Sequence, residues 1–451
     1  MKILAKLTIA VVTIFVLLQF LRPSLPFGPT TTEIQAPPQV LHVLQKDCYS
    51  CHSNEKHLSW FDQIVPGYWL VRHDILTARE HLNFSEIGSK PEAAQRAGLF
   101  EAVNMIQLGA MPLPKFTALH PDAKVSSEEL ATLKLYLAPW GSTPPNATGV
   151  SGDDRPTAGF VNLTAVAPEF NGLAFDPGFE TWKVISFTDR GDNNTFRFIL
   201  GNDVAVKAAR AGNIAPWPDG SRFAKIAWQQ VTGNDGLIHP GKFVQVEIMV
   251  KNGRLYKQTA GWGWGRWRGM DLKPYGADAR FVNECTSCHM PVRGADDVFT
   301  LPISAAKTNA EEVLNNQAAA LPPGLPYQPL EWSAITMYVD RHSHTLSTLF
   351  GNDEAMLAIP SHQVGSNATV AYQVGAVLAL VTWTERDDPH WFGARIPMTP
   401  RSIEFVRIEP QGTANTYQYF SGTETHPQPI DVQVASQRKS FVLNLTPAAL
   451  P

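Results

Sequence analysis

Apolar and polar positions divide the chain into a helical first part and a strand-rich second part. From residue 39 to about residue 137 the segments are long and mixed, as in WFDQIVPGYWLVRHDILTAREHL, and SSEEL (126–130) has the signature of a capped helix start. Beyond residue 160, short runs such as RFAKIAW and KFVQVEIMV alternate apolar and polar positions. The pattern predicts a multidomain protein, with an N-terminal all-α domain followed by domains built on antiparallel sheet.

The first 24 residues have the pattern of an export signal. Lys2 and Lys6 precede an apolar run from residue 7 to residue 21, and no Ala-x-Ala cleavage site follows closely. This favours an uncleaved signal anchor over residues 1–24, with a cleaved signal as the alternative. Positive charge at the N-terminus predicts export of the remainder, to the periplasmic side of the bacterial cytoplasmic membrane.

The strand-rich part contains two similar stretches. TWKVISFTDRGDNNTFRFILGND is echoed by EWSAITMYVDRHSHTLSTLFGND, and GSRFAKIAW is echoed by GAVLALVTW at identical length. Glu247 in FVQVEIMV matches Glu404 in RSIEFVRI, in the same order along the chain. These echoes predict a duplication, with domains at 161–305 and 306–451. The Pro- and Gly-rich residues 141–160 are interpreted as the linker that precedes them.

The composition argues against a nucleic-acid partner, and the cysteine positions assign every cysteine to one type of motif. The 451 residues carry a net charge of -4 and contain no basic run, so a nucleic-acid partner is not expected. All four cysteines lie in two CxxCH motifs, CYSCH and CTSCH. No cysteine remains for a disulfide.

The CxxCH motif is specific for covalently bound haem. Its two thiols attach to the haem vinyl groups, and the adjacent imidazole binds the iron; a redox CxxC or half of a zinc site is the alternative. The motifs therefore predict two c-type haems. The attachment and proximal ligand residues are Cys48, Cys51, His52, Cys285, Cys288 and His289.

The first haem, in a domain expected over residues 35–140, needs a sixth ligand if it transfers electrons. Met111 lies in GAMPLPKF, where two prolines stiffen the loop; Met105 is the rival ligand, and packing alone is the alternative role of Met111. With its CYSCHSNE, WLVxxD, REHLNFSE and MPLP segments, residues 1–140 resemble small membrane-anchored haem-binding domains. An all-α, cytochrome c-like fold is expected here.

The second motif has a longer context, GWGWGRWRGMDLKPYGADARFVNECTSCHMPVRGADDVFTLP, preceded by WPDGSRFAKIAWQQ. Residues 160–305 resemble the cytochrome P-460 family, sheet-rich c-type cytochromes of which some oxidise hydroxylamine and close relatives bind nitric oxide. Together with the internal repeat, the resemblance implies two α+β domains on antiparallel sheet, the second a degenerate repeat. It also implies a lysine bonded to the haem macrocycle and an open distal iron face, and it points to Lys225.

Three polar residues are candidates for the haem pocket that the resemblance implies, two of them placed by strand alternation. In RFAKIAW it places Lys225 on the face opposite the apolar core positions, and an edge-strand lysine reaching solvent is the alternative. Glu247 could take protons from a nitrogen substrate, and Arg197 could orient it or stabilise a bound anion. Both also have ordinary surface interpretations. Trp262, Trp264 and Trp267 are expected to pack against the macrocycle edge.

The second stretch serves as an internal control for these residues. Leu380 stands at the position of Lys225, Ser347 stands at that of Arg197, and no CxxCH follows Glu404. The repeat is therefore expected to bind no haem. Glu404 stands at the position of Glu247 in a repeat that has no haem motif and therefore no substrate. The case for a catalytic role of Glu247 is weaker for this reason.

Together these features predict an exported dihaem cytochrome. It would oxidise hydroxylamine, to nitric oxide or nitrous oxide, at the haem on His289 and pass electrons through the haem on His52 to an exported electron-transfer protein. The alternatives are a nitric oxide binding or sensing protein and a relay without its own substrate. The two sheet domains are expected to pair as an intrachain pseudo-dimer.

Overall fold

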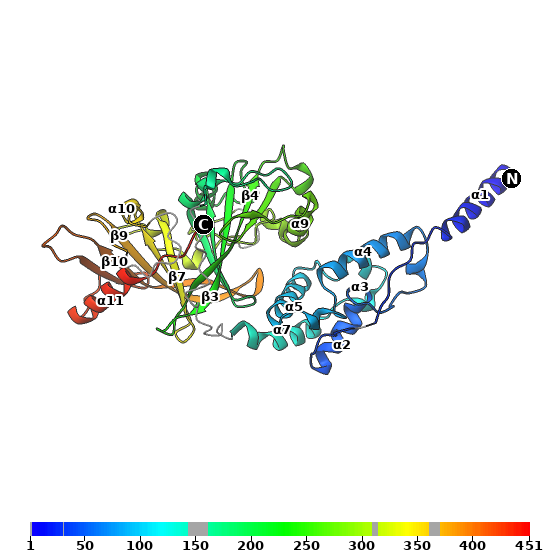
Figure 1. Ribbon diagram of the computed structural model, residues 1–451, viewed down its shortest axis with the longest axis horizontal. Coiled ribbons are helices and arrows are strands. Elements are labelled where there is room, and N and C mark those ends of the chain that lie inside the picture. Colours follow the sequence, from blue (N-terminus) through cyan, green and yellow to red (C-terminus); the bar gives the residue numbers. More distant parts are fainter. Residues whose placement is uncertain (1, 30, 143–160, 309–313, 360–369) are drawn as a thin grey trace. The chain divides into compact units, whose positions relative to one another are not determined.

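Two units make up the part of the chain that the structure describes. This computed structural model describes residues 2–29, 31–142, 161–308, 314–359 and 370–451 (Figure 1). The units are Met1–Trp140 and Gly141–Pro451. The first is helical and the second is built on antiparallel sheet, which confirms the predicted fold class. Most of the expected linker, residues 143–160, lies outside the described residues.

The helical unit is held together by apolar faces of three helices. Its helices are α1 (Lys2–Gln19), α2 (Pro38–Asp47), α3 (Tyr49–His52), α4 (Gly67–His81), α5 (Glu92–Gln107), α6 (Pro114–Thr117) and α7 (Ser127–Ser142). Buried side chains come from α2, α5 and α7, among them Leu44, Phe100 and Leu137. The α7 start has the expected reciprocal cap, since Glu129 N donates to Ser126 Oγ and Ser126 N donates to the Glu129 carboxylate.

The N-terminal helix α1 is apolar along most of its surface. Its side chains Ile3, Leu7, Ile14 and Leu17 are all exposed. Gln19 at its end both donates to and accepts from the backbone of Val65, at 3.0 Å. No helix in the described parts of the chain is both long enough and apolar enough to cross a membrane.

In its described residues, the second unit is one antiparallel sheet with four helices beside it. Its strands are β1 (Lys183–Arg190), β2 (Thr195–Gly201), β3 (Arg222–Thr232), β4 (Ile238–Lys251), β5 (Trp262–Arg268), β6 (Lys273–Pro274), β7 (Ser333–Asp340), β8 (Thr345–Gly351), β9 (Val377–Asp388), β10 (Trp391–Arg407) and β11 (Thr416–Ser421). The helices are α8 (Asp203–Ala211), α9 (Val282–His289), α10 (Asp353–Met356) and α11 (Val432–Asn444). The strand order is β3-β2-β1-β10-β9-β8-β7-β4-β5-β6, β11 pairs with β10, and β3 also pairs with β4.

The two halves of this sheet have the same local construction. The pairing of β1 with β2 is shifted after Val184, and the pairing of β7 with β8 is shifted after Ala334. Asn202 and Asn352 then cap α8 and α10 through the same side-chain bond. Two long strands follow in each half, β3 and β4 in one and β9 and β10 in the other.

Strand pairing and a shared core join the halves. Asp189 in β1 pairs with Arg395 in β10, and Ile238 in β4 pairs with Val339 in β7. One apolar cluster takes side chains from both halves. Within it, the Phe187 and Trp383 rings lie 5.1 Å apart. The halves therefore share one interior.

Candidate functional site

The first CxxCH motif lies at the junction of α2 and α3, where the backbone orients its histidine. His52 Nδ1 donates to the Leu82 carbonyl oxygen at 2.8 Å, which leaves Nε2 as the nitrogen for a metal. A backbone partner of this kind fixes the ring orientation of a ligand histidine. Both thiols, Cys48 and Cys51, are free.

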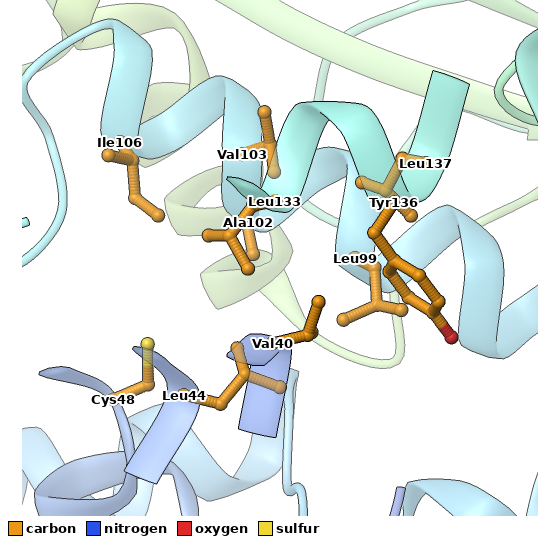
Figure 2. Close-up of a pocket in the computed structure, with 10 residues that line it drawn as sticks. All are labelled: Val40, Leu44, Cys48, Leu99, Ala102, Val103, Ile106, Leu133, Tyr136 and Leu137. Atoms are coloured by element: carbon orange, nitrogen blue, oxygen red, sulfur yellow. The ribbon is translucent and has the colours of Figure 1, made fainter. Parts of the chain in front are cut away.

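Beside Cys48, an apolar cleft opens between three helices. Figure 2 shows side chains of α2, α5 and α7 converging on it, with the Cys48 sulfur at its edge. The other residues that line it are Val40, Leu44, Leu99, Ala102, Val103, Ile106, Leu133, Tyr136 and Leu137. The cleft is almost wholly apolar and has a thiol at its edge, and this lining matches the chemistry of a haem macrocycle face.

The two methionine candidates lie close together in the chain fold. Met111 N donates to the Met105 carbonyl oxygen at 3.1 Å, in the turn that follows α5. Both side chains are half-buried, and neither lines the cleft of Figure 2. The choice between them therefore stays a prediction.

The second motif lies on α9 and repeats the histidine geometry of the first. His289 Nδ1 donates to the Asp297 carbonyl oxygen at 2.7 Å, so Nε2 is again left for a metal. Two aromatic rings flank the imidazole, Trp264 at 4.5 Å and Phe299 at 5.0 Å between centroids. Cys285 packs against the apolar cluster that contains Trp264.

Three of the predicted polar residues lie on one face of the sheet, and a fourth joins them. In the strand register, Lys225 is opposite Glu247, Glu247 is opposite Arg266, and Arg197 is opposite Ala227. Lys225 and Arg266 both form ion pairs with Glu247, the second at 3.1 Å. Since β3 pairs with β2 and β4, Lys225 is not on an edge strand.

The electrostatics of this face depend on burial and on close opposite charges. Burial lowers the pKa of Lys225 to about 8, against the opposing effect of Glu247. Burial would raise the pKa of Glu247, but Lys225 and Arg266 outweigh it and hold that pKa at about 2. Burial, with Arg190 nearby, lowers the pKa of Arg197 to about 9. Glu247 is therefore ionised near neutral pH.

Unsatisfied polar atoms mark where this site fits a bound group. Arg197 Nε and Trp264 Nε1 are buried and make no hydrogen bond within the described residues. Buried donors normally have partners. Together with the thiols of Cys285 and Cys288 and an oriented imidazole on α9, these donors fit a haem that carries hydrogen-bond acceptors at its edge.

The same positions in the C-terminal half are occupied differently. Leu380 is opposite Glu404 in the β9–β10 register, as Lys225 is opposite Glu247. Glu404 is 2% exposed and accepts hydrogen bonds from Tyr417 Oη at 2.7 Å and from the Arg438 guanidinium at 2.6 and 2.9 Å. Because Arg438 belongs to α11, this glutamate joins that helix to the sheet.

The apolar surroundings of the two faces correspond as well. On the haem-motif side, a cluster contains Ile185, Ile199 and Phe223, with Met249 and Cys285 packed against it. In the C-terminal half, a cluster contains Ile335, Leu349, Leu378, Val406 and Val442 of α11. Thus α11 covers in one half the face that α9 covers in the other.

One aromatic expectation is wrong, and sequence reasoning missed three residues. Trp267 lies on the opposite face of β5 from Trp262 and Trp264, in the shared core, because strand side chains alternate. Arg266 could have been found from the same alternation in GWGWGRW. Phe299 and Trp391 carried no sequence signal, because only tertiary contacts bring them to His289.

Two CxxCH motifs with oriented imidazoles define the class as a haem protein. Comparison with known families agrees: residues 13–139 match a haem-binding domain. Residues 176–300 match cytochrome P460, a family whose members are oxidoreductases of nitrogen compounds. No curated protein matches the chain.

Proposed function

We propose that the chain is a dihaem c-type cytochrome that oxidises hydroxylamine at the haem on His289. One observation carries the proposal: two surfaces face each other. One is α9 with its oriented imidazole, and the other is the strand face with Lys225, Glu247 and Arg197. The cytochrome P460 match over residues 176–300 supports it.

Cys285, Cys288 and His289 would hold the haem, and Lys225 would be bonded to its macrocycle. The haem would supply an iron that accepts electrons from the substrate. Oxidation of hydroxylamine to nitric oxide releases three electrons and three protons; two molecules give nitrous oxide, water, four electrons and four protons. Arg197 would orient the substrate, and Glu247 would receive protons.

Replacing Lys225 with Leu tests the proposal. Leu380 holds the same register position in the C-terminal half, so the strand should tolerate the change. We expect both haems to remain while the red-shifted absorption of a crosslinked haem and hydroxylamine oxidation are lost. Lys242→Leu, at an exposed position on β4, is the matched control. Oxidation at the wild-type rate in the Lys225 variant would reject the crosslink as the source of activity.

One observation favours nitric oxide binding as the second candidate. With a pKa near 2, Glu247 is a weak base, whereas efficient general bases have pKa values near the working pH. A site in which the Lys225–Glu247 ion pair persists would bind a gas without oxidising hydroxylamine. An ordinary c-type spectrum with rapid nitric oxide binding in the wild-type protein would favour this function, and a relay would bind no gas at either iron.

The haem on His52 would carry electrons, with Met111 as the second axial ligand. Met111→Ala should then open this iron to carbon monoxide and lower its reduction potential, because a thioether ligand raises the potential. Met105→Ala is the control and should leave both properties unchanged. The reverse result would make Met105 the ligand.

We further propose that residues 1–24 anchor the chain, so that both haems lie on the periplasmic side and donate electrons to an exported protein. The exposed apolar side chains of α1 support this. The matching strand registers and caps support a duplication in which the C-terminal half is a haemless partner of the first, as in a pseudo-dimer. In inverted vesicles, whose cytoplasmic face points outward, protease should reach only the N-terminal end of an anchored chain and leave the haem-bearing remainder protected inside.

A further inference from the structure

The turn between β9 and β10 belongs to the C-terminal half but ends beside the haem motif of the other half. It brings His390 and Trp391 next to the segment that follows α9. Backbone bonds hold the approach, since Asp192 N donates to the Gly393 carbonyl oxygen at 3.1 Å and Arg190 pairs with Ala394.

On one side, Trp391 contacts two charged residues near Arg197, namely Arg190 and Asp192. The Arg190 guanidinium lies 4.4 Å from the centre of the Trp391 ring, and Trp391 Nε1 donates to the Asp192 carboxylate at 3.1 Å. Arg190 and Asp192 are both buried and paired with each other. Their charges act in opposite directions on Arg197, the arginine of the strand face.

On its other side, Trp391 reaches the ligand histidine through one intermediate ring. Trp391 and Phe299 lie 5.6 Å apart, edge to face, and Phe299 lies 5.0 Å from the His289 imidazole. His390 Nδ1 donates to the Phe299 carbonyl oxygen at 2.7 Å. The turn thus holds Phe299 by its ring and by its backbone.

The corresponding turn of the other half lacks residues equivalent to His390 and Trp391. It connects β3 to β4 with Gly233, Asn234, Asp235, Gly236 and Leu237. Leu237 packs against the apolar cluster beside α11. Residues 233–237 contain no aromatic side chain, and the first ring after them, His239 in β4, lies 6.0 Å from Tyr338.

We propose that His390 and Trp391 are positioning residues for the haem on His289, supplied by the half that has no haem motif. Trp391 holds Phe299 against the edge of the imidazole and holds the Arg190–Asp192 pair beside Arg197. The C-terminal half thereby completes the site from both sides. The inference rests on the proposed function only for the presence of haem on His289.

The test uses the full-length holoprotein and the iron–histidine stretching band in resonance Raman spectra of the ferrous state. We expect Trp391→Ala to shift this band and to reduce hydroxylamine oxidation on the order of tenfold, as loss of supporting contacts around a metal ligand typically does. Trp391→Phe, which keeps a ring against Phe299, should restore the band. Leu237→Ala, in the corresponding turn, should leave the band and the rate unchanged.

A second variant covers the case in which Trp391→Ala does not fold. His390→Ala removes the bond to Phe299 and should shift the same band, while His390→Gln keeps a donor and should shift it less. An unchanged band in the folded Trp391→Ala or His390→Ala protein overturns the inference and leaves the proposed function standing. A shifted band without hydroxylamine oxidation in the wild-type protein supports the inference and rejects the enzyme. Wild-type protein without haem on Cys285 and Cys288 overturns both.

Discussion

The two halves of the sheet unit differ on one face and agree on the other. Toward the shared core, Ala224, Ile226 and Trp228 in β3 correspond to Ala379, Val381 and Trp383 in β9. Toward the helix, Lys225 is replaced by Leu380. A strand can change one face without disturbing the other, because successive side chains point in opposite directions.

The conserved position of one glutamate shows how far the two faces have diverged. Glu247 pairs with Lys225 and Arg266 on neighbouring strands, while Glu404 pairs with Arg438 on α11. One carboxylate thus belongs to the face under the haem motif, and the other ties a helix to the sheet. Glutamate in the C-terminal half consequently needs no haem to explain it.

The largest expected difference between the halves is that only one of them loses a haem when its residues are replaced. Under the proposed function, replacing both Cys285 and Cys288 with Ala should reduce the covalently bound haem from two per chain to one, because a CxxCH motif attaches haem through its two thiols. Intact mass and the pyridine haemochrome spectrum measure the change. A third haem in the wild-type protein would show that the C-terminal half is not haemless.

Breaking the Glu404–Arg438 pair should destabilise the protein next most strongly. Arg438→Ala leaves a buried carboxylate without its cation, which costs about 3 kcal/mol of unfolding free energy. Replacing both residues with Leu should recover most of that loss, because no buried charge then remains unpaired. Urea denaturation measures both, and a double variant as unstable as Arg438→Ala would contradict the structural role of the pair.

The corresponding tryptophans should respond alike. Trp228 Nε1 donates to the Ala449 carbonyl oxygen at 2.6 Å, and Trp383 Nε1 donates to that of Ala319 at 2.9 Å. Replacing either with Phe removes one buried hydrogen bond and leaves some space, at about 2 kcal/mol each. Thermal unfolding compares them; costs that differ by more than about 1 kcal/mol would show that the two core faces are not equivalent.

A change in the pKa of Glu247 is the smallest effect. Burial favours its neutral form and is outweighed by Lys225 and Arg266, so Arg266→Gln should raise this pKa from about 2 by roughly one unit, or about 1.4 kcal/mol. The depressed pKa stabilises the fold above the unfolded value of about 4.3, and this contribution is lost as pH falls toward 2. The variant should therefore lose less unfolding free energy over that range, as measured by acid unfolding. The infrared band of the protonated carboxyl group reports the pKa itself, and Glu247→Gln, which removes that band, identifies it.

The sequence by itself predicted the haem chemistry and determined the order of the parts. CxxCH specifies covalent haem attachment through adjacent residues, and strand alternation is a local property, so both could be read without a fold. The same alternation placed Lys225 and Glu247 opposite the core positions Ile226 and Val246. The capped start of α7 was equally local, because Ser126 and Glu129 bond within one turn.

Only the tertiary structure decided which distant residues meet. Trp391 contacts Arg190 and Phe299, and α11 brings Arg438 to Glu404, through strand pairings that join opposite ends of the sheet unit. Local patterns contain no information on such pairings, since they depend on which apolar faces pack together. The shared core determined them: burying both inner faces against each other placed the β9–β10 turn beside the haem motif.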